Sequence, residues 1–326
     1  MGLTPPSFSR RSLLKAAPAA LLLSSSGSRA AQWPTRTVKV VVPYLAGGLT
    51  DTGARITAEH LARELGQPFV IENRVGASGN IATESVIRGD DDHTLLFAVP
   101  SQLVIAPLLQ KLAFDPRKQL KPVARVFGSS FVLAVHPSLG VKTLPEFVAK
   151  VRANPGKFNY GSNGRGGIIH LVTEWLKQVA ELDIVHVPYT GSPPLIADLI
   201  TNRVQAYIGN YADLVPQAQA GKVHLIAVTA PQRIAELPAV ETFAESYPAF
   251  QMVFWNGYCA SQAVPDAAVA SVSAALRAFM ARDDVVATFR KLGVQPIIDT
   301  PAEFSSELDR AQGVFQRVIT AARISL

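Results

Sequence analysis

Three times along this chain, a short apolar run ends in a glycine-rich turn that leads directly into a helix pattern. The turns span residues 44–51, 160–167 and 189–194, and each begins with tyrosine. Runs of β-branched residues such as 37–42 are typical of buried strands, whereas apolar spacings of three and four residues predict helices. The alternation of the two patterns predicts an α/β fold, with a mostly parallel sheet and helices on both of its faces.

The remaining patterns extend this alternation and divide it into two series. The division falls near His136 and Pro137, and the chain of 326 residues is long enough for two separate cores. Strands are expected at 37–42, 68–72, 94–99, 131–135, 158–160, 184–187, 204–208, 224–228 and 250–258. Helices are expected at 51–65, 81–87, 168–179, 195–200, 265–281 and 301–319, and a further helix should begin near residue 143. We therefore expect two lobes with two crossings between them, one lobe formed by 33–131 and 254–326 and the other by 132–253.

Residues 1–30 have the composition of an export signal. The segment SRRSLLK at 9–15 resembles a twin-arginine signal, and the apolar stretch 16–23 follows it. Small residues up to Ala30 match the positions that a signal peptidase reads, so we expect a periplasmic protein cleaved near Ala30. The alternatives are a basic amphipathic N-terminus and a membrane anchor, although the apolar stretch is too short to span a bilayer.

The net charge of +6 belongs mostly to this leader. Residues 1–30 carry four basic residues and no acidic residue, so removing them leaves a net charge of +2. This balance argues against nucleic acid as a partner, because nucleic-acid binding needs a dense basic patch. The single cysteine, Cys259, lies in an apolar stretch, and we expect it to be a buried thiol.

The glycine-rich turns suit the capture of an anion. The first N–H groups of a helix have no partner within the helix, and the helix dipole is positive at that end. In an open α/β sheet such turns lie at the carboxyl ends of the strands, where ligands usually bind. Hydroxyl groups of Thr50, Ser162 and Ser192 stand in or beside the turns. The pattern favours reversible binding of a carboxylate, although such turns also serve simply as connections.

Signatures of catalysis and of metal binding are missing from the sequence. There is no G-x-S-x-G elbow, no Walker phosphate loop and no H-E-x-x-H pattern. His170 and Glu174 share a helix face and could hold a metal, but a histidine that holds the turn or touches the ligand is the favoured interpretation. The acidic residues 90–92 are expected to form a solvated turn, with Ca²⁺ as the alternative. We expect no catalytic residue, no metal and no cofactor.

Four ordered segments resemble the tripartite tricarboxylate transporter substrate-binding family, also called Bug proteins. VPYLAGGLTD at 42–51 and IENRVGASGNIATESV at 71–86 are similar to the motifs of the family's first lobe. NPGKFNYGSNGRGGIIHL at 154–171 and VPYTGSPPLIADLITNRVQ at 187–205 are similar to the motifs of its second lobe. The resemblance covers essentially the whole chain after the leader.

The resemblance implies a type II periplasmic-binding fold that closes like a hinge on a ligand in the cleft between its lobes. It implies capture of a small carboxylate and its delivery to membrane permease subunits, or signalling through a sensor kinase. Matched position by position, the ligand-binding candidates are Tyr44, Ala46, Gly48, Asp51, Ser101, Ser162, Gly166, His170, Tyr189 and Gly191.

Departures from the family pattern bear on the identity of the ligand. Ala46 replaces a usual proline, Leu49 stands where a small residue is common, and Gly167 and Gly209 replace polar residues. A bulkier or less polar ligand than a simple dicarboxylate is therefore an open alternative. We expect a monomeric, non-catalytic receptor. The alternative from another class is an exported α/β enzyme that acts on a small acid, with His170 or Asp51 in acid–base work.

Overall fold

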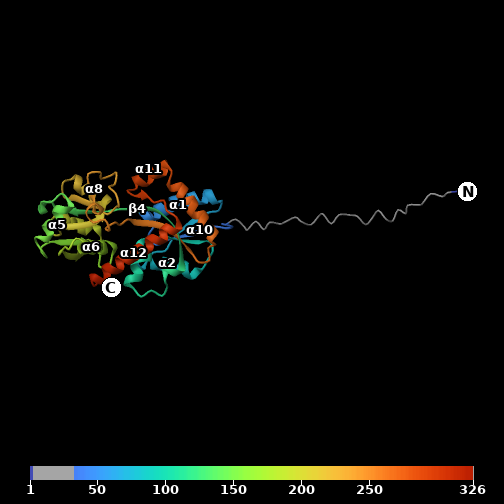
Figure 1. The fold of residues 1–326 in the computed structure, drawn as a ribbon, viewed down its shortest axis with the longest axis horizontal. Coiled ribbons are helices and arrows are strands. Elements are labelled where there is room, and N and C mark those ends of the chain that lie inside the picture. Colours follow the sequence, from blue (N-terminus) through green and yellow to red (C-terminus); the bar gives the residue numbers. More distant parts are fainter. Residues whose placement is uncertain (3–32, 326) are drawn as a thin grey trace.

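The computed structural model describes residues 1–2 and 33–325, and two six-stranded sheets form its framework. The expected export signal at residues 1–30 lies almost entirely outside the described residues. The first sheet has the order β12-β4-β11-β3-β1-β2 and the second has the order β10-β9-β5-β8-β6-β7. We call the part of the chain around the first sheet the first lobe, and the part around the second sheet the second lobe. Figure 1 shows them at opposite ends of the molecule, with β4 running between them.

The first sheet is mixed, and this corrects the expectation of a mostly parallel sheet. β1 pairs with β2 and β3 in parallel, whereas β11 runs antiparallel to both β3 and β4, and β12 is antiparallel to β4. Its strands are β1 (Val38–Val42), β2 (Phe69–Asn73), β3 (Thr94–Ala98), β4 (Leu120–Ser129), β11 (Phe254–Ser261) and β12 (Gln295–Pro296). The direction differs because β11 inserts between β3 and β4 only after the chain has returned from the second sheet.

The second sheet combines parallel and antiparallel pairs in a similar way. β6, β7 and β8 run parallel, and β5 runs antiparallel to β8 and β9. Its strands are β5 (Phe131–Val135), β6 (Asn159–Ser162), β7 (Val185–Pro188), β8 (Ala206–Asn210), β9 (His224–Val228) and β10 (Glu241–Thr242). The chain enters this sheet directly after Ser130 and leaves it before β11. The predicted lobe boundaries at 131/132 and 253/254 stay a prediction.

Helices cover the sheets and one of them links the lobes. The longer helices are α1 (Leu49–Leu65), α2 (Asn80–Gly89), α5 (Leu144–Arg152), α6 (Ile168–Val179), α7 (Ser192–Ile200), α8 (Tyr211–Gln219), α10 (Asp266–Met280), α11 (Asp283–Lys291) and α12 (Pro301–Ala321). Short helical turns are η1 (Ala77–Gly79), η2 (Ser101–Ile105), α3 (Ala106–Leu109), α4 (Pro116–Gln119), η3 (Pro137–Leu139) and α9 (Phe243–Ser246). Trp255 of β11 packs edge-on against Phe304 of α12, and Phe315 of α12 packs against Trp175 of α6. Helix α12 thus contacts both lobes, as Figure 1 shows.

The buried apolar residues form two cores. One lies in the first lobe among β1, α1, α10 and α11. The other fills the second lobe, continues along α12 and includes residues of α2, η2, β3 and β11 of the first lobe. Cys259 is buried in the second of these cores, as expected, and burial raises the pKa of its thiol to about 12. Among the described residues, no helix has the length and apolar character needed to cross a membrane.

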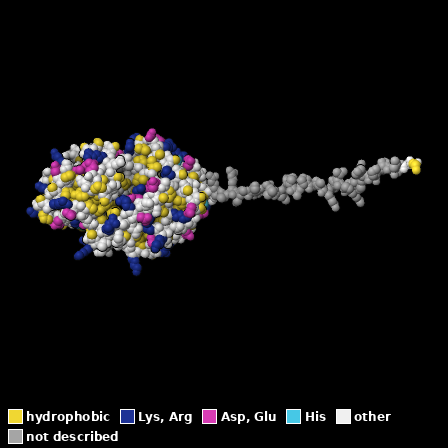
Figure 2. Space-filling model, viewed as in Figure 1, with side chains coloured by type: hydrophobic (Ala, Val, Ile, Leu, Met, Phe, Trp, Pro, Cys, Tyr) yellow, Lys and Arg dark blue, Asp and Glu magenta, His cyan; other side chains and the backbone are white. Residues whose placement is uncertain are grey.

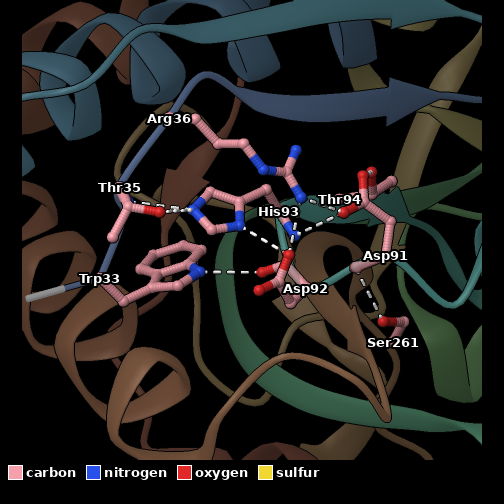
Figure 3. A network of polar contacts seen from close by, with 8 residues as sticks. All are labelled: Trp33, Thr35, Arg36, Asp91, Asp92, His93, Thr94 and Ser261. Carbon is pink, nitrogen blue, oxygen red and sulfur yellow. Dashed lines mark hydrogen bonds and ion pairs between the residues drawn. The ribbon is translucent and has the colours of Figure 1, made fainter. Parts of the chain in front are cut away.

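The acidic turn before β3 keeps the contact with solvent that was expected, and its side chains also form a network of ion pairs. Arg36 contacts the carboxylates of Asp91 and Asp92 at 2.6 and 2.7 Å, and Asp92 contacts Nδ1 of the buried His93 at 2.8 Å. Figure 3 shows that these side chains point toward one another. The Asp91, Asp92 and His93 ligand atoms lie within 4.8 Å of one another, but Arg36 already occupies both carboxylates. The network therefore anchors the segment around Arg36, which precedes β1, to the first sheet.

Charged side chains of both signs are interspersed over the face of the molecule that Figure 2 shows. Lys and Arg alternate there with Asp and Glu, and apolar atoms lie between them. Mixed charge of this kind gives no field of one sign on that face.

Candidate ligand-binding site

The first-lobe turn joins the end of β1 to the start of α1. Gly47 has φ +88°, a value that favours glycine, and Gly48 is the N-cap of α1 without any side-chain cap. Ala46 and Gly48 are both exposed. Because no side chain occupies the helix N-terminus, its first N–H groups remain available to an anion.

Asp51 stabilises the conformation of this turn through buried hydrogen bonds. Its carboxylate is 1% exposed and accepts hydrogen bonds from the Gly47 N–H at 2.9 Å, from Arg55 at 2.8 and 3.0 Å, and from Asn73 at 2.8 Å. Burial alone raises the pKa of this carboxyl, but the bonds from Arg55, Gly47 and Asn73 outweigh burial and lower the pKa to about 2. Asp51 is therefore ionised and fully engaged within the protein. Its direct contact with a ligand stays a prediction.

Two further turns lie beside the first one at the same edge of the sheet. Asn73, at the end of β2, also donates to the Tyr44 carbonyl at 2.9 Å. Ser101 begins the π-helical turn η2 after β3, and its hydroxyl lies 3.4 Å from the Tyr44 hydroxyl. β1, β2 and β3 run parallel, so their carboxyl ends meet here. The structure thus brings together the first-lobe candidates Tyr44, Ala46, Gly48, Asp51 and Ser101.

Four exposed apolar side chains lie in the same segments as these polar groups or close to them in sequence. Leu45, Leu49, Val75 and Ile81 are 73%, 41%, 48% and 50% exposed, and all four lie in the segments that follow β1 and β2. The two segments are joined by the bond from Asn73 to the Tyr44 carbonyl. We define these four side chains as the apolar rim. Exposed apolar side chains are typical of binding surfaces where they form a contiguous patch.

In the second lobe, the turn after β6 is held at both of its ends by histidine. The Ser162 hydroxyl is buried, donates to the Gly164 carbonyl at 3.1 Å and lies 2.6 Å from Nε2 of His186. His170, also buried, accepts a hydrogen bond at Nδ1 from the Gly166 N–H at 2.9 Å. His170 therefore holds the turn. Since Gly167 is the N-cap of α6 without a side-chain cap, a second helix N-terminus is also available.

The two histidine rings stack on each other and on a buried tyrosine. The ring centroids of His170 and His186 are 4.0 Å apart, and those of Tyr160 and His186 are 4.9 Å apart. Burial, together with the competing protonation of the adjacent His170, lowers the pKa of His186 to about 4, and burial also lowers the pKa of His170. Both imidazoles are therefore neutral at neutral pH.

The turn after β7 completes the second group. The Tyr189 hydroxyl donates to Asp198 at 2.8 Å, and burial together with this bond raises its pKa to about 12. The Tyr189 backbone N–H donates to the Ser162 carbonyl at 2.9 Å, which ties the two turns together. Gly191 precedes α7, which begins at Ser192. The structure thus gathers Ser162, Gly166, His170, Tyr189 and Gly191 at one edge of the second sheet.

Each group of candidates is coherent within its own lobe. Among the residues that the structure describes, no hydrogen bond or ion pair joins the first-lobe group to the second-lobe group. Sequence reasoning missed Asn73, Arg55 and His186, which hold the turns. Asn73 lies inside a segment that resembles a family motif, and His186 directly precedes another.

Two mixed sheets with helices and glycine-rich turns at their strand ends define the fold of a periplasmic binding protein. The model of the tripartite tricarboxylate transporter family receptor matches residues 53–308, so this chain belongs to that family. The chain is 30% identical to the protein BugT of Bordetella pertussis over 290 residues, which are 86% of this chain and 89% of BugT.

Solved structures with bound carboxylates have the same fold. Rpa4515 of R. palustris with adipate has 31% identity and a TM-score of 0.72, over 90% of this chain and 99% of that one. MatC of Rhodopseudomonas palustris with bound malate has 29% identity and a TM-score of 0.67, over 88% of this chain and 99% of that one. The predicted family and fold class are thereby confirmed.

Proposed function

We propose that this protein is a periplasmic receptor that binds a small carboxylate reversibly and delivers it to the permease subunits of a tripartite tricarboxylate-type transporter. The observation that carries the proposal is the pair of uncapped helix N-termini, of α1 and α6, each beside a glycine-rich turn at the carboxyl edge of its sheet. The adipate and malate that similar receptors hold support a carboxylate as the ligand.

Binding by these groups needs no chemical step. Each hydrogen bond from a backbone N–H to a charged carboxylate contributes roughly 1.5–3 kcal/mol, so a few of them suffice for reversible capture. A ligand that contacts both lobes binds the closed state better than the open state and thereby favours closure. The Ser162 hydroxyl is 0% exposed and already bonded to the Gly164 carbonyl, which argues against its use as a nucleophile. We therefore include the absence of catalysis in the proposal.

The proposal extends to export and assembly. A twin-arginine signal at residues 1–30 would direct the chain to the periplasm and be cleaved near Ala30. The receptor would act as a monomer. Intact-mass measurement of protein purified from the periplasm tests the cleavage, and a mass that includes residues 1–30 would contradict it.

A thermal-shift panel on the purified protein tests the ligand class. Adipate, malate and aromatic monocarboxylates are the probes, and amines of matched size are the controls. A true ligand at a hundred times its Kd should raise the free energy of unfolding by roughly 2.7 kcal/mol. We expect stabilisation by at least one carboxylate and its recovery unchanged. A flat response to all carboxylates would refute the ligand class, and turnover would favour an enzyme.

The apolar rim predicts a preference within the carboxylates. Acids with an apolar body, such as adipate, should bind more tightly than the hydroxylated malate, because the rim buries methylene groups and offers a hydroxyl no partner. Replacing Leu49 with serine should weaken adipate binding about five- to tenfold, or roughly 1–1.4 kcal/mol, and change malate binding much less. Calorimetric titration measures both affinities.

A matched control for Leu49→Ser is Val70→Ser. Val70 is 51% exposed on β2, outside the rim. The control should leave both affinities unchanged. If Leu49→Ser and Val70→Ser behave alike, the rim is not part of the site.

A further inference from the structure

The turn between Ser162 and Gly166 depends on two histidines that come from different elements. His186 of β7 lies 2.6 Å from the Ser162 hydroxyl, and His170 of α6 accepts from the Gly166 N–H at 2.9 Å. Because the Ser162 hydroxyl donates to the Gly164 carbonyl, the contact with His186 is satisfied when Nε2–H of His186 donates to Ser162. Each end of the turn is thus held by one imidazole in one defined neutral tautomer.

Protonation of His170 is incompatible with this arrangement. A protonated His170 carries hydrogen on Nδ1 and can no longer accept from the Gly166 N–H. The rings lie 4.0 Å apart with an interplanar angle of 14°, so a charge on one ring disfavours a charge on the other. A protonated His186 could still donate from Nε2 to Ser162, so the proton that removes a bond to the turn is the one on His170.

Charged groups of both signs face the pair. Glu174 favours a proton on either histidine, but burial of the rings outweighs its effect on their pKa, and its carboxylate already accepts from Tyr160 at 2.6 Å and from Lys177 at 2.8 Å. Lys177 and Arg165 are both cationic and disfavour a further positive charge. The lowered pKa of each histidine agrees with this geometry.

We propose that His170 and His186 are positioning residues for ligand binding, and that proton uptake by this pair releases the turn and lowers ligand affinity in acid. The inference rests on the proposed function. Above the pKa of the pair the turn keeps its shape and affinity is full. As the pH falls through that pKa, the folded protein takes up a proton, the His170–Gly166 bond is lost and the ligand dissociates.

Non-titrating variants separate the proton from the hydrogen bonds. In His170→Asn the amide oxygen can accept from the Gly166 N–H, and in His186→Gln the amide nitrogen can donate to Ser162. Each protein's affinity at pH 7.5 serves as its own reference, so the double variant reports the pH profile of a turn that has no titrating ring. His186→Phe keeps the ring stack but not the donor, and it should lose about tenfold in affinity because the buried Ser162 loses its partner.

The test measures adipate affinity by calorimetry from pH 7.5 to pH 4. Since adipate also titrates there, the readout is the loss of affinity relative to pH 7.5, compared between the wild type and the double variant at each pH. We expect the wild type to lose on the order of fivefold more affinity than the double variant by pH 4, because titration costs up to tenfold per pH unit. The imidazole NMR signals of the wild type should report protonation over the same range, and His136→Gln should keep the wild-type profile.

Two outcomes would overturn the inference. One is an identical pH profile in the wild type and the double variant, and the other is full affinity in His186→Phe at pH 7.5. If no carboxylate binds the wild type even at pH 7.5, the proposed function itself fails, and the two failures are thereby distinguished.

Discussion

Asp51→Ala is expected to lower the free energy of unfolding by about 3–5 kcal/mol and to weaken carboxylate binding by more than tenfold. The substitution removes the acceptor for the Gly47 N–H, for Asn73 and for Arg55. Hydrogen bonds to a buried ionised group are stronger than those between neutral groups. Two of the three donors, the Gly47 N–H and Asn73, lie at the turns of the proposed binding site. Urea denaturation and calorimetric titration measure the two effects.

Asp213→Ala is the matched control, because Asp213 is exposed in the first turn of α8. It should cost under about 1 kcal/mol, the ordinary contribution of an acid at a helix N-terminus. Asp51 also predicts acid sensitivity. Its folded pKa of about 2 lies below the ordinary 3.8, so its contribution is present above pH 3.8 and is lost as the pH falls toward 2. A wild-type pH profile in Asp51→Ala would contradict this role.

Gly257→Ala is expected to destabilise the first lobe by more than about 3 kcal/mol, or to prevent folding. A Cβ at Gly257 would lie 2.6 Å from the Ala124 carbonyl oxygen and 2.9 Å from the Arg125 Cα. Both contacts are with the backbone of β4, the neighbour of β11, so no side chain can move aside. Thermal unfolding followed by circular dichroism measures the loss.

Gly89→Ala is the control for this prediction. A Cβ there meets nothing within 4 Å, and Gly89 ends α2 without a positive φ. Alanine should be neutral or slightly stabilising at this position. Equal stability of Gly257→Ala and Gly89→Ala would show that β11 and β4 can separate without cost.

Local pattern was enough for several elements. The strands expected at 131–135 and 224–228 have those bounds in the structure as β5 and β9, and the helix expected at 168–179 is α6. In each case the spacing of apolar residues along the chain predicts which face of the strand or helix is buried against the neighbouring layer of the fold.

Other elements were missed because distant partners stabilise them. The long strand β4 contains Lys121, Pro122 and Arg125, which break the apolar pattern. In the structure Lys121 contacts Asp266 at 2.7 Å, and Arg125 contacts Asp299 at 2.6 Å. Helix α8 was missed because it contains Pro216, and the amphipathic helix α11 was also not predicted.

The candidate site shows the same distinction between what local sequence predicts and what distant contacts decide. The sequence determined where the glycine-rich turns stand, which helices they open, and the family whose motifs they resemble. Only the tertiary structure decided that β11 runs antiparallel between β3 and β4 and that His186 stacks on His170. It also decided that the Asp51 carboxylate is buried and bonded to the Gly47 N–H and Asn73. The physical reason is that periodicity and turn chemistry act between neighbours in the chain. Strand direction and the pairing of buried polar groups depend on contacts between residues far apart in sequence.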